Sequence, residues 1–392
     1  MFYSAFLLSV FFFGLKAENS ENDYDLNITQ TINKYGYPVE THEVTTEDGY
    51  ILNIFRIPHG KEGSGVNEKT MLVMHGLFGQ AENFIIAGIY NASLAYHLAD
   101  NGYDVWLGNS RGNHHGKRHI KLSPNIKAFW NFSWHEIGIN DIPAMIDYIL
   151  EKKKIKQIYY TGHSQGATAF YVMATMKPEY QNKIKVASLL APAAFMDHFK
   201  HKIIWPLLRN YRTVLIIADL FYEFIPESIP IFKFLFNMCK ENMYENICLG
   251  IYNTLAGSES GDFRKEILPL VMKYAPSVSF KQIQHFVQAY KSAKFRQFDY
   301  GRRKNLEIYG SPEPPDYPLN TINVPVASYY SKSDKIVDYK DIEHTCDVLP
   351  NIVRKFSIPT EKFTHLDFVL HPDTKSLIQP VLQFLEKYDR KR

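Results

Sequence analysis

The sequence predicts an α/β protein in which a mostly parallel, doubly wound sheet is interrupted once by a helical insertion. Three observations support this fold class. Short apolar runs alternate with helix-like stretches over the first half of the chain, the alternation stops between about Phe195 and Asn320, and two more apolar runs follow near the C-terminus. Strands that alternate with helices are typical of parallel sheets.

The predicted elements follow in order along the chain. The first two strands form a hairpin, because they flank the turn residues Glu47, Asp48 and Gly49. The predicted strands are 43–46, 51–57, 70–74, 103–107, 157–161, 186–190, 326–330 and 353–358. The predicted helices of the sheet-forming part are 93–99, 141–151, 167–176 and 377–388.

The composition excludes several classes of protein. Apolar residues make up 45% of the 392 residues and charged residues only 22%, so the chain has the material for a large core and is not disordered. The net charge is +3. A protein that binds phosphate backbones needs a concentrated basic excess, so no nucleic-acid partner is predicted. Aromatic residues are abundant, with 27 Phe and 26 Tyr.

The N-terminus predicts export. An uncharged apolar run from Phe2 to Leu15 ends at Lys16 and Ala17, before a polar stretch. The length of this run and the small residue at its end are typical of a secretory signal peptide over residues 1–17. An uncleaved membrane anchor is the alternative interpretation. No other segment has the length and apolar character of a membrane span.

Two further features fit a secretory route. The sequence N-x-[ST], the acceptor of N-glycosylation, occurs at Asn27, Asn91 and Asn131. Cys239 and Cys248 lie nine positions apart, and a disulfide closing that short loop would stabilise the fold by roughly 2–3 kcal/mol. Three free buried thiols, the third being that of Cys346, are the other interpretation.

The motif that carries chemistry is the pentapeptide GHSQG at 162–166. It follows a predicted strand and precedes a predicted helix, which is the context in which G-x-S-x-G forms a sharp nucleophile turn. The turn exposes Ser164 Oγ above the sheet and directs the N–H of Gln165 at the developing oxyanion. We therefore predict that Ser164 is a nucleophile.

A serine nucleophile needs a base that a carboxylate orients. In this fold class the partners follow in the order Ser, Asp or Glu, His, on loops after late strands. Asp334 follows the strand predicted at 326–330, and His365 follows the strand at 353–358, so we assign them as orienter and base. The competing acids are Asp338 and Asp341, interpreted as surface or helix-capping carboxylates, and the competing histidines are His344 and His371.

The second oxyanion donor is expected in the loop after the strand at 70–74. There His75, Gly76 and Leu77 fit the H-G pattern, with the N–H of Leu77 as donor. His75 and His163 are interpreted as structural histidines, and His163 is expected to point away from the side chain of Ser164.

The sequence predicts no cofactor and no metal. The histidines between Asn113 and His119 lack the H-E-x-x-H pattern and a paired carboxylate, so this segment is interpreted as a polar loop. Neither a G-x-G-x-x-G nor a Walker sequence is present, so no nucleotide is implied.

Segments throughout the chain resemble the animal acid lipases, the gastric and lysosomal acid lipases. They are YGYPVE at 35–40, TEDGYIL at 46–52, RIPHG at 56–60, HGL at 75–77, GYDVWLGNSRGN at 102–113, GHSQG at 162–166 and HLDF at 365–368. By position, the resemblance supports Ser164, Asp334 and His365 as the triad and Leu77 and Gln165 as oxyanion donors. It also matches Cys239 and Cys248 to a pair of cysteines in the family's cap.

The resemblance implies an α/β-hydrolase with a helical cap and lid that hydrolyses neutral lipid esters, triacylglycerols or steryl esters, at a lipid–water interface. The expected organisation is a signal peptide at 1–17, a first core part at 18–195, a cap and lid insertion at 196–320, and a second core part at 321–392. We expect a secreted or lysosomal enzyme. The alternatives are a carboxylesterase or acyltransferase on other acyl substrates and a non-catalytic lipid-binding protein.

The insertion fits a lid on its own composition. Aromatic and aliphatic residues are concentrated there, including those at 221–224 and 232–236, with charges between them. Such a stretch could cover the active site and face a lipid surface when displaced. Ordinary packing of helices onto the core is the alternative interpretation.

Overall fold

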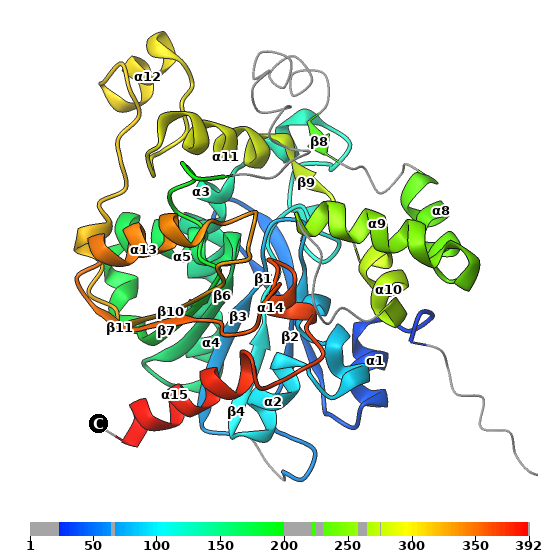
Figure 1. Cartoon of the computed structure of the whole chain (residues 1–392). Coiled ribbons are helices and arrows are strands. Elements are labelled where there is room, and N and C mark those ends of the chain that lie inside the picture. Colours follow the sequence, from blue (N-terminus) through cyan, green and yellow to red (C-terminus); the bar gives the residue numbers. More distant parts are fainter. Residues whose placement is uncertain are drawn as a thin grey trace, which may run out of the picture.

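A central sheet with helices on both sides organises the chain (Figure 1). The structure is a computed structural model that describes residues 23–63, 67–199, 222–224, 230–257, 265–274 and 276–390. The predicted signal peptide at 1–17 and much of the predicted lid lie outside the described residues.

The sheet is mostly parallel, as predicted. In spatial order its strands are β1 (Glu40–Thr45), β2 (Tyr50–Ile57), β4 (Tyr103–Leu107), β3 (Lys69–Met74), β6 (Ile158–His163), β7 (Ile184–Leu190), β10 (Val326–Tyr330) and β11 (Ile352–Ser357), and β5 (Arg118–His119) pairs with β2. The six strands from β4 to β11 in this order pair in parallel, while β1 and β2 form the predicted antiparallel hairpin at one edge.

Alternate residues of the strands explain the two layers of helices. In β3, Met71 and Val73 point to one face of the sheet and Leu72 and Met74 to the other, because successive strand side chains alternate. The first face packs against α2 (Leu94–Asp100) and α15 (Ile378–Arg390), and the second against α4 (Ile142–Lys153) and α5 (Gln165–Met176). Parallel strands buried on both faces are accordingly mostly apolar, although Asp104 of β4 is a buried carboxylate.

Shorter helices complete the sheet-forming part. They are α1 (Ile28–Lys34), η1 (Ala81–Phe84), η2 (Ile86–Tyr90), η3 (Lys127–Trp130), α3 (Trp134–Glu136), η4 (Ile137–Asp141), η5 (Pro178–Lys183), η8 (Leu319–Thr321), α13 (Tyr339–Val348) and α14 (Asp367–Leu370). The predicted helix at 93–99 corresponds to α2, whose N-terminus is capped by Ser93: its side chain accepts a hydrogen bond from the N–H of Tyr96.

Between β7 and β10 the described chain is mainly helical. Its elements are β8 (Glu223–Phe224), α8 (Pro230–Cys239), η6 (Asn242–Tyr244), α9 (Glu245–Ala256), η7 (Lys265–Ile267), α10 (Leu268–Lys273), β9 (Val278–Ser279), α11 (Phe280–Ser292) and α12 (Arg302–Tyr309). In Figure 1, α11 and the short β8–β9 pair lie beyond one end of the central sheet. A disulfide between Cys239 and Cys248 joins α8 to α9, whereas Cys346 is a buried free thiol.

A buried ion pair fixes the loop after β4. The Arg111 guanidinium donates to the carboxylates of Asp141 and Asp48, and its Cζ lies 4.0 Å from the ring centroid of Tyr50. Arg111 and Asp141 are both buried. A buried charge is tolerated only when it is paired and hydrogen-bonded, so these contacts hold residues 109–113 in one conformation.

No described helix combines the length and apolarity that crossing a bilayer requires.

Candidate active site

Ser164 lies in a strained turn between β6 and α5. Its φ of 52° and ψ of −116° place the backbone in a region that side-chain-bearing residues rarely adopt. The flanking glycines make the turn possible: a Cβ on Gly162 would lie 2.8 Å from the carbonyl carbon of Gly166, and a Cβ on Gly166 would lie 2.5 Å from the carbonyl oxygen of Met74. The turn therefore needs the G-x-S-x-G sequence.

The structure brings Ser164, His365 and Asp334 together from three loops. His365 Nε2 lies 2.8 Å from Ser164 Oγ, and His365 Nδ1 lies 2.7 Å from Asp334 Oδ2. All three residues are buried. When Asp334 is ionised, Nδ1–H donates to its carboxylate, which leaves the Nε2 lone pair to accept the proton of Ser164.

The carboxylate of Asp334 is held by the backbone that follows it. Its Oδ1 atom accepts hydrogen bonds from the N–H groups of Ile336 at 2.8 Å and Val337 at 3.0 Å. These bonds leave Oδ2 directed at His365, so the carboxylate orients the imidazole.

The competing acids and histidines have other contacts. Asp338 caps α13, where it accepts from the N–H of Lys340. Asp341, interpreted as a surface or helix-capping carboxylate, is buried in the first turn of α13, and its Oδ1 lies 2.6 Å from His198 Nδ1. The ring of His344 stacks on Phe195. The fourth competitor, His371, contacts the ring of Phe363.

The two predicted oxyanion donors flank the nucleophile. Gln165 is the first residue of α5, and an N–H at that position has no acceptor within the helix. Leu77 follows Gly76, at which a Cβ would lie only 3.0 Å from Ser164 Cβ, so the loop after β3 passes directly beside the nucleophile. Phe78, the next residue, has a left-handed φ of 57° that bends this loop.

His75 anchors the loop that carries Leu77. Its Nδ1 lies 2.8 Å from the carbonyl oxygen of Gly76, and its Nε2 accepts from the N–H of Ser110 and from Nδ2 of Asn113, both at 3.1 Å. Burial lowers the pKa of His75 to about 4, so the ring stays neutral and Nε2 can accept. The interpretation of His75 as structural agrees with these contacts.

Two asparagines in this network were missed by the sequence analysis. Asn109 Oδ1 accepts from the N–H of Ala81 at 3.0 Å and from Asn113 Nδ2 at 2.9 Å. Both asparagines lie in the segment 102–113, which carries part of the family resemblance. That resemblance was the one signal in the sequence that could have identified them.

His163, which was interpreted as a structural histidine pointing away from the side chain of Ser164, contacts the base. Its Nε2 donates to the carbonyl oxygen of His365 at 3.1 Å, and the two ring centroids lie 4.9 Å apart. Burial, with a smaller contribution from His365, lowers the pKa of His163 well below its ordinary value. His163 therefore supports the backbone of the base as a neutral ring.

Another buried histidine, His285 of α11, is expected to make the free energy of unfolding depend on pH. Burial lowers its pKa from 6.5 to about 3. Below pH 6.5 the imidazole of His285 binds a proton in the unfolded chain but stays neutral in the folded chain. The free energy of unfolding therefore decreases as the pH falls through this range. We expect the free energy of unfolding of a His285→Gln variant to fall less than that of the wild type between pH 6.5 and 5, by about 2 kcal/mol. Urea titrations at both pH values measure the free energy of unfolding of each protein. Equal decreases in the wild type and the variant would contradict the prediction.

The polar loop at 113–119 holds no metal-site geometry. His115 Nε2 lies 2.8 Å from the buried carboxylate of Glu82, and His119 accepts from backbone N–H groups. Elsewhere in the described part, Asp197, His198 and Asp341 place possible ligand atoms within 4.8 Å of one another. His198 Nδ1 is already hydrogen-bonded to Asp341, so this group is a hydrogen-bonded cluster outside the site.

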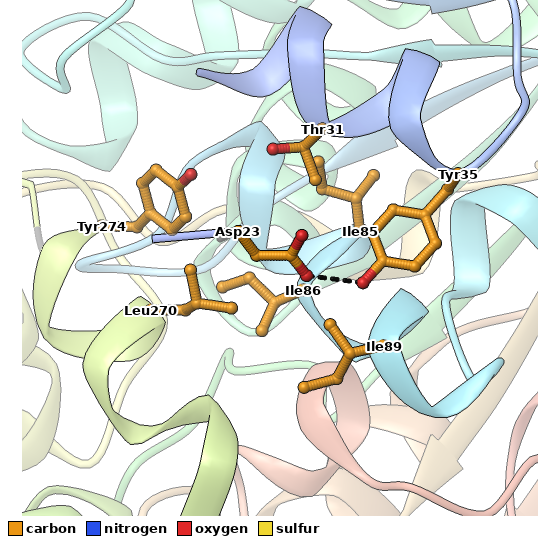
Figure 2. A pocket seen from close by; sticks show the side chains of 8 residues that line it. All are labelled: Asp23, Thr31, Tyr35, Ile85, Ile86, Ile89, Leu270 and Tyr274. Atoms are coloured by element: carbon orange, nitrogen blue, oxygen red, sulfur yellow. Dashed lines mark hydrogen bonds between the residues drawn. The ribbon is translucent and has the colours of Figure 1, made fainter. Parts of the chain in front are cut away.

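A small pocket lies apart from these residues, between the N-terminal segment and α10 (Figure 2). Ile85, Ile86 and Leu270 contribute apolar side chains, and Asp23 accepts from the hydroxyl of Tyr35 at 2.6 Å. Its cavity of about 10 Å³ is close to the minimum that one water molecule needs. This pocket is too small for a lipid chain, and no triad residue lines it.

Comparison with known proteins finds families and relatives that the chain matches. Residues 28–88 match the family model described as a partial α/β-hydrolase lipase region, and residues 69–215 match the α/β hydrolase fold. Lipase 1 of Drosophila melanogaster is 38% identical over 95% of this chain and 82% of its own length. Human gastric triacylglycerol lipase is 36% identical over 88% of this chain and 86% of its own length.

Two other relatives extend the comparison. Lysosomal acid lipase/cholesteryl ester hydrolase of Macaca fascicularis is 33% identical over 95% of this chain and 94% of its own length. Among solved structures, a soluble variant of monoglyceride lipase from Saccharomyces cerevisiae aligns with a TM-score of 0.53 over 89% of this chain and 96% of its own, at 15% identity. At that identity the structural likeness concerns the fold alone.

Proposed function

This chain belongs to the animal acid lipase family and hydrolyses lipid esters, and we propose that it does so through Ser164, His365 and Asp334. The observation that carries this proposal is the pair of buried hydrogen bonds that joins the three side chains, at 2.8 and 2.7 Å. The substrates are neutral lipid esters, triacylglycerols or steryl esters, and the mechanism passes through an acyl-enzyme.

The reaction follows from the geometry. Ser164 Oγ attacks the ester carbonyl carbon while His365 Nε2 takes its proton, and Asp334 stabilises the imidazolium that forms. The backbone N–H groups of Leu77 and Gln165 stabilise the negative oxygen of the tetrahedral intermediate. His365 then gives the proton to the departing alcohol. Water, activated by the same histidine, attacks the acyl-enzyme and releases the carboxylic acid and free Ser164.

Residues 196–320 form the cap and lid of this enzyme, between core parts at 18–195 and 321–392. Large apolar side chains on the described cap helices support contact with a lipid–water interface. Phe234, Met243 and Ile247 are 60%, 80% and 55% exposed, and all lie on or between α8 and α9. Exposed apolar groups gathered on one segment mark interaction surfaces.

The enzyme is exported through the signal peptide at 1–17 and resides outside the cell or in lysosomes. Asn27, Asn91 and Asn131 are its glycosylation sites. Their side chains are exposed, as attachment of a glycan requires. The disulfide between Cys239 and Cys248 fits an oxidising compartment.

The activity is tested with three substrates from pH 4 to pH 8: an emulsified triacylglycerol, an emulsified cholesteryl ester and a water-soluble short-chain ester. We expect hydrolysis of at least one emulsified ester, with a rise in rate where the substrate passes its solubility limit. Hydrolysis of the soluble ester alone would support a carboxylesterase instead. Acyl transfer to an added alcohol in preference to water would support an acyltransferase.

A further inference from the structure

Helix α11 of the cap is attached firmly to the core beside the active site. Figure 1 shows it beyond the end of the sheet at which β6 and β3 finish. Three contacts hold it: Ser279 Oγ donates to the carbonyl oxygen of Trp130 at 2.6 Å, Lys281 Nζ lies 3.2 Å from Glu136 Oε1, and the ring of His285 stacks on that of Trp134 with centroids 3.5 Å apart. These contacts therefore hold α11 in a fixed position relative to the core.

A fourth contact reaches the catalytic machinery. Gln282 Nε2 donates to Oε1 of Gln165 at 3.1 Å, while Gln282 Oε1 accepts from the N–H of Ser279 at 2.9 Å. Both glutamines are 2% exposed. The amide of Gln282 thus joins the N-terminal cap of α11 to the side chain of the residue that directly follows Ser164.

The geometry points to Gln282 as a positioning residue for the oxyanion site, an inference that rests on the proposed function. The N–H of Gln165 stabilises the oxyanion, and such a donor works only when it is fixed in advance at the right place. A buried amide–amide bond is strong in the low local dielectric, and a buried oxygen left without its donor forces the chain to rearrange. Gln282 touches no reacting atom: it holds Gln165, and through it the N–H.

The hydrogen bond between Gln282 and Gln165 explains how a cap segment 117 residues away in sequence affects stabilisation of the oxyanion. The peptide that joins Ser164 to Gln165 carries the donor N–H, so rotation of this peptide is the motion that would misdirect the donor. Fixing the Gln165 side chain from the cap opposes that rotation. Small displacements of positioned groups are costly in rate.

The test uses the full-length enzyme with a water-soluble short-chain ester, so that binding to lipid surfaces does not enter. We expect Gln282→Leu to lower kcat about tenfold, less than the 10²–10³-fold that loss of a whole oxyanion donor costs, with little change in KM. The rate of labelling by a fluorophosphonate should fall in parallel. The matched control is Lys281→Met on the same helix, which removes the ion pair to Glu136 and should keep kcat within twofold.

A double-mutant cycle separates positioning from a general loss of stability. If Gln282 acts through the side chain of Gln165, then Gln165→Leu alone and the double variant with Gln282→Leu should lose the same activity. Losses that multiply in the double variant, or an unchanged kcat in Gln165→Leu, would overturn the inference. Gln165→Leu leaves the cap of α11 intact, so it still decides the matter if Gln282→Leu does not fold.

The wild type reports on the proposed function independently. An inactive wild-type enzyme that no fluorophosphonate labels would refute the proposed function itself. A wild type that is active and labelled, together with a fully active Gln282→Leu, would refute only the role of Gln282.

Discussion

Replacing Ser164 with alanine is expected to lower kcat for every ester substrate by about 10⁴-fold or more, because no other group then forms the acyl-enzyme. His365 Nε2, which lies 2.8 Å from Ser164 Oγ, loses the proton that it would accept. Residual hydrolysis would come only from water attacking substrate bound beside the oxyanion donors. The measurement is kcat on the soluble ester and on an emulsified triacylglycerol, with fluorophosphonate labelling of the intact protein.

A buried serine elsewhere in the sheet gives the matched control. Ser188 of β7 is fully buried, and its hydroxyl has no hydrogen-bond partner among the described residues. Ser188→Ala should keep wild-type kcat and labelling. Thermal unfolding of both variants checks that they fold. A Ser164→Ala enzyme that keeps more than a tenth of wild-type kcat would refute Ser164 as nucleophile.

The fold was predictable because its signals are local. The buried strand β3 ends in the apolar run 71–74, which His75 and Gly76 follow, and β6 leads into the GHSQG turn. Asp334 and His365 could be proposed as well, because each follows the end of a strand, and parallel strands bring such loops to the same edge of a sheet.

Helix α1 was missed and the start of strand β1 was placed too late, each for a local reason. Helix α1 begins at an Asn27–Gln30 capping box, but Asn27 was interpreted only as a glycosylation acceptor. Strand β1 begins at Glu40, three residues before the prediction, because Glu40 and His42 pair with β2 although they are not apolar. Hydrophobic patterning does not detect a polar edge strand.

The supporting contacts of the site could not be predicted, since they join segments distant in sequence. His163 lies 202 residues from the carbonyl group to which it donates, and Gln282 lies 117 residues from Gln165. Gln282 belongs to no short motif, and His163 occupies a variable position of G-x-S-x-G, to which the motif assigns no partner. Such contacts depend on how the cap and the C-terminal loop pack over β6, which no single-segment pattern contains.

Asp334→Asn is expected to lower kcat by about 10⁴-fold while leaving the fold intact. The carbonyl oxygen of the asparagine would keep the hydrogen bonds from Ile336 and Val337, which fix the orientation of the side chain. Its NH₂ group would then face His365 Nδ1 in place of the carboxylate oxygen that now lies 2.7 Å away. Because NH₂ can only donate, Nδ1 must accept, and the imidazole proton moves to Nε2. His365 could then no longer take the proton of Ser164.

The same substitution at Asp338 separates the orienter from its closest competitor. Asp338 caps α13, and asparagine caps helices about as well as aspartate. Asp338→Asn should therefore keep kcat within twofold and leave the unfolding temperature unchanged. Both variants are measured side by side on the soluble ester. A large loss of kcat in Asp338→Asn, together with wild-type kcat in Asp334→Asn, would assign the orienting role to Asp338 instead. A large loss of kcat in Asp334→Asn alone, in a protein that unfolds at the wild-type temperature, would mean that the carboxylate of Asp334 acts on the protonation of His365 and not on the fold.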